Sequence, residues 1–233
     1  MSVPAENRLA APPPLHDEGR LAALAHPESM AAEQYRLLLA RLERMKAARP
    51  MRVVAVTSCA RGEGRSMTAA SLALTAAREG REVALVECDL RRPSLAGLFE
   101  IEPRGGLAEV VRGEVELQQA LVRVDGVMVL CAGEARDPPA LLRNPRLAMT
   151  LDTLRASFPL VVLDAPPALA LSDAARLEGV VDGMLLVVKA GETPREVVRL
   201  AVEGLGDRLL GIVLNGVEEP GYARYLRHEA PAS

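Results

Sequence analysis

Short apolar runs alternate with longer amphipathic stretches through most of the chain. From Glu28 to Lys46 apolar side chains recur every three or four residues, which predicts an amphipathic helix ending before Pro50. The later runs are apolar at every position and are separated by helix-length stretches, as is typical of buried parallel strands joined by crossover helices. They are Val53–Val56, Val83–Val86, Val127–Leu130, Leu160–Leu163, Leu185–Val188 and Ile212–Leu214. We therefore predict an α/β fold with an open, mostly parallel sheet flanked by helices.

The two ends of the chain lack this pattern. Residues 1–28 are rich in Ala and Pro and show no helical or strand period, so we expect a flexible leader there. The predicted domain then covers residues 29–217, and residues 218–233 form a C-terminal tail. A length of 233 residues is enough for one sizeable core.

Composition and charge exclude several classes of protein. Hydrophobic residues make up 49% of the chain and charged residues 25%, which is typical of globular proteins. A net charge of −3 gives no general attraction to nucleic acid, so we expect no nucleic-acid partner. No apolar run approaches the roughly 18 residues that cross a bilayer, and no signal peptide is apparent, so we expect a cytoplasmic protein without direct membrane insertion. The three cysteines lack metal-ligand spacing, and we expect neither a disulfide nor a zinc site.

A glycine-containing loop follows the first predicted strand and precedes a helical pattern over Met67–Arg78. Gly62 and Gly64 would let the backbone approach an anion, and the helix N-terminus would supply N–H groups, so phosphate is the expected ligand. The strict P-loop pattern fails twice, because Cys59 stands at its first Gly and Arg65 at its Lys. A plain glycine turn is the alternative.

Acidic residues follow two other predicted strands. Glu87 and Asp89 come after the second strand and Asp164 after the fourth, which should place them at the same edge of the sheet as the loop. In P-loop enzymes an Asp after an apolar strand holds Mg²⁺, usually through water, while the loop Ser or Thr ligates it; Asp164 and Ser66 fit these roles. Asp89 or Asp164 alone could equally cap a helix, but the three loops together favour a nucleotide site.

Taken together, these motifs resemble the catalytic domain of bacterial tyrosine kinases of the capsule and exopolysaccharide type. The likeness covers roughly residues 30–216 and rests first on the Gly62-Glu63-Gly64-x-Ser66 loop and the Asp89-Leu90-Arg91-Arg92-Pro93 segment. It continues through Gly105-Gly106-Leu107, Ala132-Gly133, Pro138-Pro139, Asp164-Ala165-Pro166-Pro167, Asp182-Gly183 and Gly211–Asn215. These kinases share their loops with the MinD and ParA class of ATPases, which lacks the Arg-Arg-Pro segment.

The resemblance implies a P-loop NTPase fold of the deviant-Walker type that binds ATP and Mg²⁺. In the family, the first loop is Walker A, the acidic pair belongs to a second Walker A element, and the Asp after the fourth predicted strand is Walker B. The nucleotide-binding residues implied in this chain are Arg61, Gly62, Glu63, Gly64, Arg65, Ser66, Met67 and, near the adenine, Asn215, for which a turn residue is the alternative. The implied catalytic residues are Arg65, Glu87, Asp89 and Asp164, with Glu87 or Asp89 positioning the attacking hydroxyl, and the metal ligands are Ser66, Asp89 and Asp164.

Partners are also implied by the resemblance. The family phosphorylates tyrosines mostly in trans within a homo-oligomer, and a membrane polysaccharide co-polymerase activates the kinase through its cytoplasmic tail. Such a partner would recruit this chain to the inner face of the cell membrane. Tyr222 and Tyr225 in the tail are the candidate acceptors, with ordinary amphipathic side chains as the alternative. The Glu28–Lys46 helix would either dock a neighbouring subunit or pack on the core, and we expect Tyr35 to pack rather than to be a substrate.

Four residues depart from the family pattern. Arg65 replaces the Walker A lysine, Met67 the usual Thr, and Glu87 the first Asp of the acidic pair. Leu39 replaces the last Arg of the Glu-x-x-Arg-x-x-Arg helix, in which Glu33 and Arg36 remain. A guanidinium is wider and more planar than an ammonium, so the exchange at position 65 is not conservative in a tight loop.

Three functions follow as hypotheses. The first is a tyrosine kinase whose arginine arose by drift, since Lys46 and Lys189 are the only lysines among 28 basic residues. The second is a catalytically weak nucleotide-binding scaffold for the co-polymerase. A MinD- or ParA-type positioning ATPase is third, disfavoured by the Arg91-Arg92-Pro93 segment and by a C-terminus without an amphipathic helix.

Overall fold

The computed structural model describes residues 29–48, 50–169, 176–177 and 179–217. The predicted leader, the C-terminal tail and both candidate acceptor tyrosines lie outside these residues. The strands are β1 (Val53–Ser58), β2 (Val83–Glu87), β3 (Val122–Val124), β4 (Val127–Leu130), β5 (Leu160–Asp164), β6 (Gly183–Lys189) and β7 (Leu209–Asn215). The helices are α2 (Met30–Ala48), α3 (Arg65–Arg78), α4 (Leu95–Leu98), α5 (Leu107–Arg112), α6 (Leu117–Ala120), α7 (Pro138–Arg143), α8 (Pro145–Ser157) and α10 (Arg195–Leu205), with a 3₁₀ turn, η2, at Gly206–Arg208.

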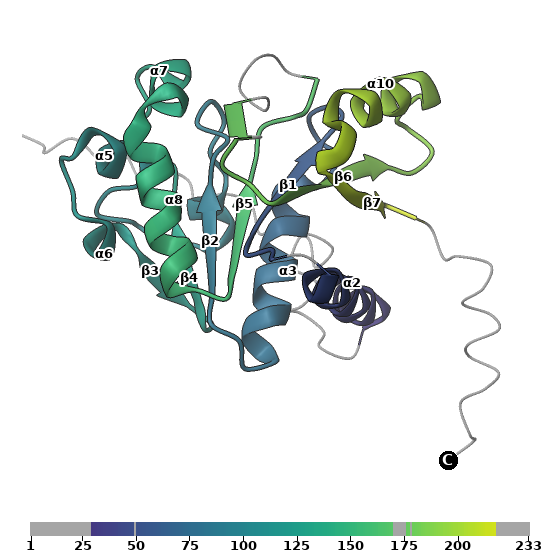
Figure 1. The fold of residues 1–233 in the computed structure, drawn as a ribbon, viewed down its shortest axis with the longest axis horizontal. Coiled ribbons are helices and arrows are strands. Elements are labelled where there is room, and N and C mark those ends of the chain that lie inside the picture. Colours follow the sequence, from purple (N-terminus) through teal and green to yellow (C-terminus); the bar gives the residue numbers. More distant parts are fainter. Residues whose placement is uncertain (1–28, 49, 170–175, 178, 218–233) are drawn as a thin grey trace, which may run out of the picture.

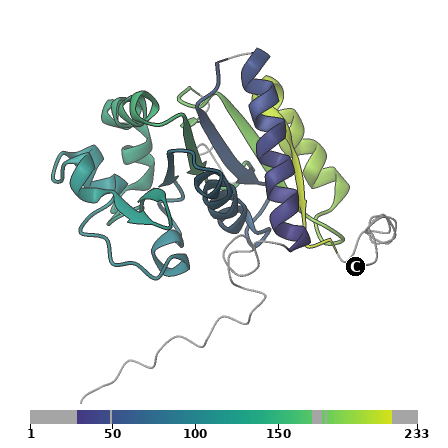
Figure 2. The same ribbon diagram turned by 90° about the horizontal axis from the view of Figure 1, so that it is seen from below.

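The predicted α/β fold is confirmed. The strands form one sheet in the order β3-β4-β2-β5-β1-β6-β7, and every neighbouring pair except β3 and β4 is parallel. In Figure 1, α5, α6 and α7 lie toward the β3–β4 end of the sheet, and α2 and α10 toward the β6–β7 end. Figure 2 shows the same division from below, with α2 and α10 both away from the teal helices.

The prediction missed β3, a short antiparallel edge strand. It pairs with β4 through a tight hairpin in which Asp125 and Gly126 both adopt left-handed backbone conformations, with φ of 47° and 87°. Asp-Gly between two Val-rich runs is a signature of this hairpin turn. The signal was therefore present in the sequence, but it marks a three-residue strand too short for a periodicity to register.

Two apolar cores cover the two faces of the sheet. Successive residues of β1 pack into opposite cores. Val53 and Ala55 pack with α5, α7, α8 and α10, whereas Val54 and Val56 pack with α2 and α3. Both faces of the central strands are thus buried, which explains their continuous apolar runs. Leu39, which stands in place of the family's arginine, is fully buried in the second core, so this position of α2 supports packing.

The carboxyl ends of β1, β2 and β5 meet at one edge. Asp164 at the end of β5 stands in register with Val56 of β1 on one side and with Glu87 of β2 on the other. The main-chain oxygen of Asp164 accepts hydrogen bonds from the N–H groups of Cys88 (2.8 Å) and Asp89 (3.1 Å). This backbone pairing carries the turn after β2 alongside the end of β5.

Candidate nucleotide-binding site

The loop between β1 and α3 has the backbone of an anion cradle. Gly62 and Gly64 have φ of 79° and 86°, left-handed backbone conformations that residues other than glycine rarely adopt. Helix α3 begins at Arg65 with no side-chain cap and no acidic residue in its first turn. The first N–H groups of a helix have no intrahelical acceptor, so here they remain for an external anion at the positive end of the helix dipole.

Two predicted nucleotide-binding residues hold this loop from behind. Glu63, buried, accepts hydrogen bonds from the Ala60 N–H (2.9 Å) and from the Thr193 hydroxyl (2.5 Å). Asn215 at the end of β7 donates from its side-chain amide to the Glu63 carbonyl at 2.9 Å. A Cβ added to Gly64 would lie 2.0 Å from that same amide nitrogen. Glu63 and Asn215 therefore tie the loop to β7 and to the β6–α10 connection.

Arg65 brings two acidic loops together. Its Nη2 lies 2.5 Å from Oδ2 of Asp89, and its Nε lies 3.1 Å from Oδ1 of Asp164. Its Nη1 donates to the Ser58 hydroxyl at 3.3 Å. The guanidinium is thus held between the ends of β1, β2 and β5, where three of the predicted catalytic side chains converge.

Asp164 is a buried carboxyl group with a raised pKa. Its side chain is fully buried, and its Oδ2 has no hydrogen-bond partner of normal geometry in the described part of the chain. Burial raises the pKa of Asp164 to about 6, although the Arg65 guanidinium and the Ser66 hydroxyl beside it act in the opposite direction. A buried carboxylate oxygen without a partner is costly and is the kind of group that a bound cation satisfies. The donor set of Asp164, Ser66 and Asp89 therefore fits Mg²⁺, which prefers oxygen ligands.

Glu87 is separated from this cluster although it is only two residues from Asp89. Its carboxylate is fully buried and accepts hydrogen bonds from three main-chain N–H groups, those of Ser94, Leu95 (2.8 Å) and Ala132 (3.0 Å). Burial raises the pKa of Glu87, and these three hydrogen bonds offset part of the rise. The side chain therefore fixes the start of α4 and the loop after β4, while Asp89 faces the cluster.

A cavity of about 890 Å³ opens over the loop. Its lining includes six of the predicted nucleotide-binding residues, namely Arg61, Gly62, Gly64, Arg65, Ser66 and Met67. Asp89, Arg92 and Ser94 line it from the turn after β2, and Gly97 and Leu98 from α4. Asn215 instead lines a cavity between α2 and β7, and Asp164 lies beneath Arg65 rather than at the cavity surface.

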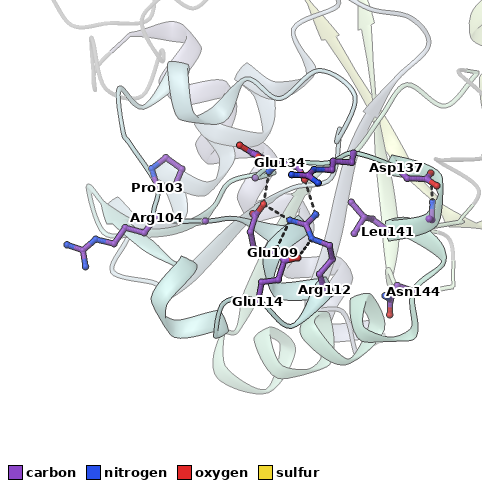
Figure 3. A pocket seen from close by; sticks show the side chains of 13 residues that line it. Pro103, Arg104, Glu109, Arg112, Glu114, Glu134, Asp137, Leu141 and Asn144 are labelled. Atoms are coloured by element: carbon purple, nitrogen blue, oxygen red, sulfur yellow. Dashed lines mark hydrogen bonds and ion pairs between the residues drawn. The ribbon is translucent and has the colours of Figure 1, made fainter.

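A second cavity, of about 720 Å³, lies near α5 and α7 (Figure 3). Arg112 is central in it, and its guanidinium is already paired with Glu109 at 2.9 Å and Glu114 at 2.8 Å. Glu109 also accepts from the N–H groups of Gly106 (2.7 Å) and Glu134 (2.9 Å). The carboxylates of Glu109 and Glu114 therefore neutralise the charge of Arg112 in this cavity.

Gly106 and Gly133 explain two motifs of the family resemblance. A Cβ on Gly106 would lie 2.3 Å from the Gly133 nitrogen, so the loop before α5 and the loop after β4 can approach this closely only with glycine at position 106.

Among the described residues, no group of three or more His, Cys, Asp or Glu side chains is arranged to hold a metal ion. A metal at the loop would therefore need the Ser66 hydroxyl and non-protein ligands in addition to the carboxylates of Asp89 and Asp164. No helix in the described ranges is long and apolar enough to cross a membrane.

Comparisons with known proteins agree with this geometry. The ParA family model, described as NUBPL iron-transfer P-loop NTPase, matches residues 49–215. The tyrosine-protein kinase YwqD of Bacillus subtilis is 34% identical over 209 residues, which cover 87% of this chain and 88% of YwqD. The chain belongs to the bacterial tyrosine kinases. The P-loop NTPase fold expected from the resemblance is thereby confirmed.

Two further relatives extend the comparison. The kinase domain of the Escherichia coli tyrosine kinase ETK superposes with a TM-score of 0.81 at 28% identity, covering 87% of this chain and 83% of that domain. ExoP of Rhizobium meliloti, named a succinoglycan biosynthesis transport protein, is 31% identical over 85% of this chain. The match covers only 26% of ExoP, so most of that protein has no counterpart here.

Proposed function

We propose that this chain binds ATP with Mg²⁺ in the loop cavity and transfers the γ-phosphoryl group to protein tyrosine, within a system that makes or exports a surface polysaccharide. The observation that carries the proposal is the convergence of Arg65, Asp89 and Asp164 beneath two left-handed glycines at one sheet edge. Phosphoryl transfer depends mainly on positioning and charge stabilisation, and both can be supplied at this edge.

Each residue then has a defined part. The N–H groups at the start of α3, with Gly62 and Gly64, would bind the phosphates, and Ser66, Asp89 and Asp164 would hold Mg²⁺. The bound metal would neutralise charge on the phosphate oxygens. Asp89, which lines the cavity, would also orient the attacking hydroxyl and accept its proton at a carboxylate oxygen. Glu87 would keep the Asp89 turn in place through its three main-chain contacts, while Glu63 and Asn215 would do the same for the phosphate loop.

A catalytically weak nucleotide-binding scaffold is the second candidate. It is favoured by the ion pairs of Arg65, whose charge is directed at Asp89 and Asp164 rather than held free for phosphate. Displacement of a catalytic group by about 1 Å can cost on the order of 100-fold in rate, so binding would survive better than transfer.

Partners and location are part of the proposal. We infer that the chain forms a homo-oligomer, is cytoplasmic, and is recruited to the inner face of the membrane by the cytoplasmic segment of a polysaccharide co-polymerase. ExoP supports this inference, because its name links a sequence like this one to polysaccharide transport within a much longer chain. The domain limits 29–217, with Tyr222 and Tyr225 as acceptors beyond them, remain part of the same proposal.

The test uses the full chain with labelled ATP and Mg²⁺, with and without the co-polymerase segment, and measures phosphotyrosine and nucleotide affinity separately. A kinase would label Tyr222 or Tyr225 and lose the label in Asp164→Asn but not in the exposed control Asp152→Asn. Nucleotide binding without label in either condition would favour the scaffold. Under that outcome we expect Arg65→Lys, which restores the family residue, to raise labelling by about 10- to 100-fold. A chain that binds neither ATP nor ADP would refute both candidates.

A further inference from the structure

The Arg65 guanidinium occupies the space between the two carboxylates best placed to hold a metal ion. Its Nη2 contacts Asp89 at 2.5 Å and its Nε contacts Asp164 at 3.1 Å. The three side chains are almost completely buried, with 10%, 8% and 0% of the side chains of Arg65, Asp89 and Asp164 exposed. Charge-assisted hydrogen bonds in such surroundings are among the stronger polar contacts in proteins.

Arg65 also shields Asp164 from the cavity. Arg65 and Asp89 line the cavity over the loop, whereas Asp164 does not and is fully buried. An ion arriving from the cavity therefore meets the guanidinium before it meets Asp164. The second oxygen of Asp164, Oδ2, still has no hydrogen-bond partner of normal geometry among the described residues, so the arginine satisfies this carboxylate only in part.

The shape of arginine matters for this arrangement. The guanidinium presents several donors in a planar fork, and here different donors reach carboxylates from two separate strand ends. A lysine ammonium is a compact point charge and cannot span the same two partners with that geometry. Because one tethered cation already contacts both carboxylates and offsets part of their charge, a divalent metal must displace at least the contact to Asp164 before it can bind there.

We propose that Arg65 is a tethered cation that competes with the divalent metal for Asp89 and Asp164, so that the metal binds tightly only when a nucleotide draws the guanidinium away. The proposal rests on the nucleotide site proposed above and adds a regulatory role for the residue that departs from the family lysine. Competition of this kind makes metal and nucleotide binding positively coupled, and by linkage each ligand strengthens the other by the same factor. Couplings of this kind amount to about 5- to 150-fold.

The experiment measures Mn²⁺ binding to the nucleotide-free full chain from the electron paramagnetic resonance signal of free Mn²⁺. We expect Arg65→Gln to bind Mn²⁺ at least about fivefold more tightly than the unsubstituted chain, and Arg65→Lys to show an intermediate gain. Arg92→Gln is the matched control, because Arg92 lines the same cavity and its removal changes the same charge, whereas Asp89 and Asp164 form their ion pairs with Arg65. Its Mn²⁺ affinity should stay within about twofold of the unsubstituted chain.

The same titrations with ADP present complete the test. ADP should increase Mn²⁺ affinity more in the unsubstituted chain than in Arg65→Gln, because in the variant the competing cation is already gone. Equal nucleotide-free Mn²⁺ affinities in the unsubstituted chain, Arg65→Gln and Arg65→Lys would overturn the proposal, as would an equal gain in Arg92→Gln. If Arg65→Gln does not fold, as judged by circular dichroism, Arg65→Lys decides the question alone. Failure of the unsubstituted chain to bind ADP would instead refute the nucleotide site itself.

Discussion

Glu87 offers a sharp separation between a structural and a catalytic role. Its fully buried carboxylate accepts hydrogen bonds from three main-chain N–H groups in two different loops. In Glu87→Gln the side-chain oxygen can still accept from Ser94 and Leu95, but the new NH₂ group faces the N–H of Ala132 and leaves it without an acceptor. An unsatisfied buried donor costs about 1–3 kcal/mol, so we expect the free energy of unfolding to fall by about that amount. Glu87→Ala would leave all three donors unsatisfied and should be destabilised further.

Urea denaturation at neutral pH, followed by circular dichroism, measures this change, and ADP titration of the folded variant measures the site. Glu114→Gln is the matched control, because the Glu114 side chain is largely exposed and pairs with Arg112 at the surface. Surface ion pairs of this kind contribute little, so we expect Glu114→Gln to leave the free energy of unfolding nearly unchanged. We expect Glu87→Gln to lose stability but to keep ADP affinity within a few fold. An unchanged free energy of unfolding together with lost phosphotyrosine labelling would show that Glu87 acts in catalysis and would refute the anchoring role.

Three other predictions test the loop and the buried carboxylate. Gly64→Ala should lower the free energy of unfolding by about 1–2 kcal/mol because of its left-handed backbone, and it should also weaken ADP binding because its Cβ would meet Asn215. The control Gly80→Ala, with φ of 78° and open space around it, should lose only the backbone energy. Equal ADP affinities of the two variants would contradict this reasoning. Thr193→Val removes the hydroxyl that donates a hydrogen bond to Glu63, so the free energy of unfolding should fall by about 1.5–3 kcal/mol and ADP affinity should fall severalfold. Thermal melts and ADP titration measure the two effects. An unaltered melt would count against a structural role of the Thr193–Glu63 contact. The pKa of Asp164 is raised to about 6, so the folded state binds the proton more tightly than the unfolded state. The free energy of unfolding should therefore fall as pH rises from about 4 to about 6 and then level off. Urea titrations across this range should show a smaller fall in Asp164→Asn, and an identical profile would exclude Asp164 as its source.

Much of the fold and part of the site could be predicted from the sequence. Continuous apolar runs such as Val53–Val56 can be buried on both faces only in a sheet covered by helices, so the parallel architecture follows from local pattern. Parallel strands bring their carboxyl ends to one edge, which is why the loop glycines, Asp89 and Asp164 could be expected together. The left-handed conformations of Gly62 and Gly64 agree with the expectation of a backbone cradle.

Side-chain partners, by contrast, were decided only by the tertiary structure. Glu87 and Asp89 are two residues apart, yet one accepts three main-chain N–H groups and the other pairs with Arg65. Arg65 and Asp164 are 99 residues apart, and no local pattern states that the guanidinium turns to the carboxylate rather than outward to the cavity. Periodicity reports which face of an element is buried, whereas the partner of a charge depends on distances of a few ångströms between segments that meet only after the chain has folded.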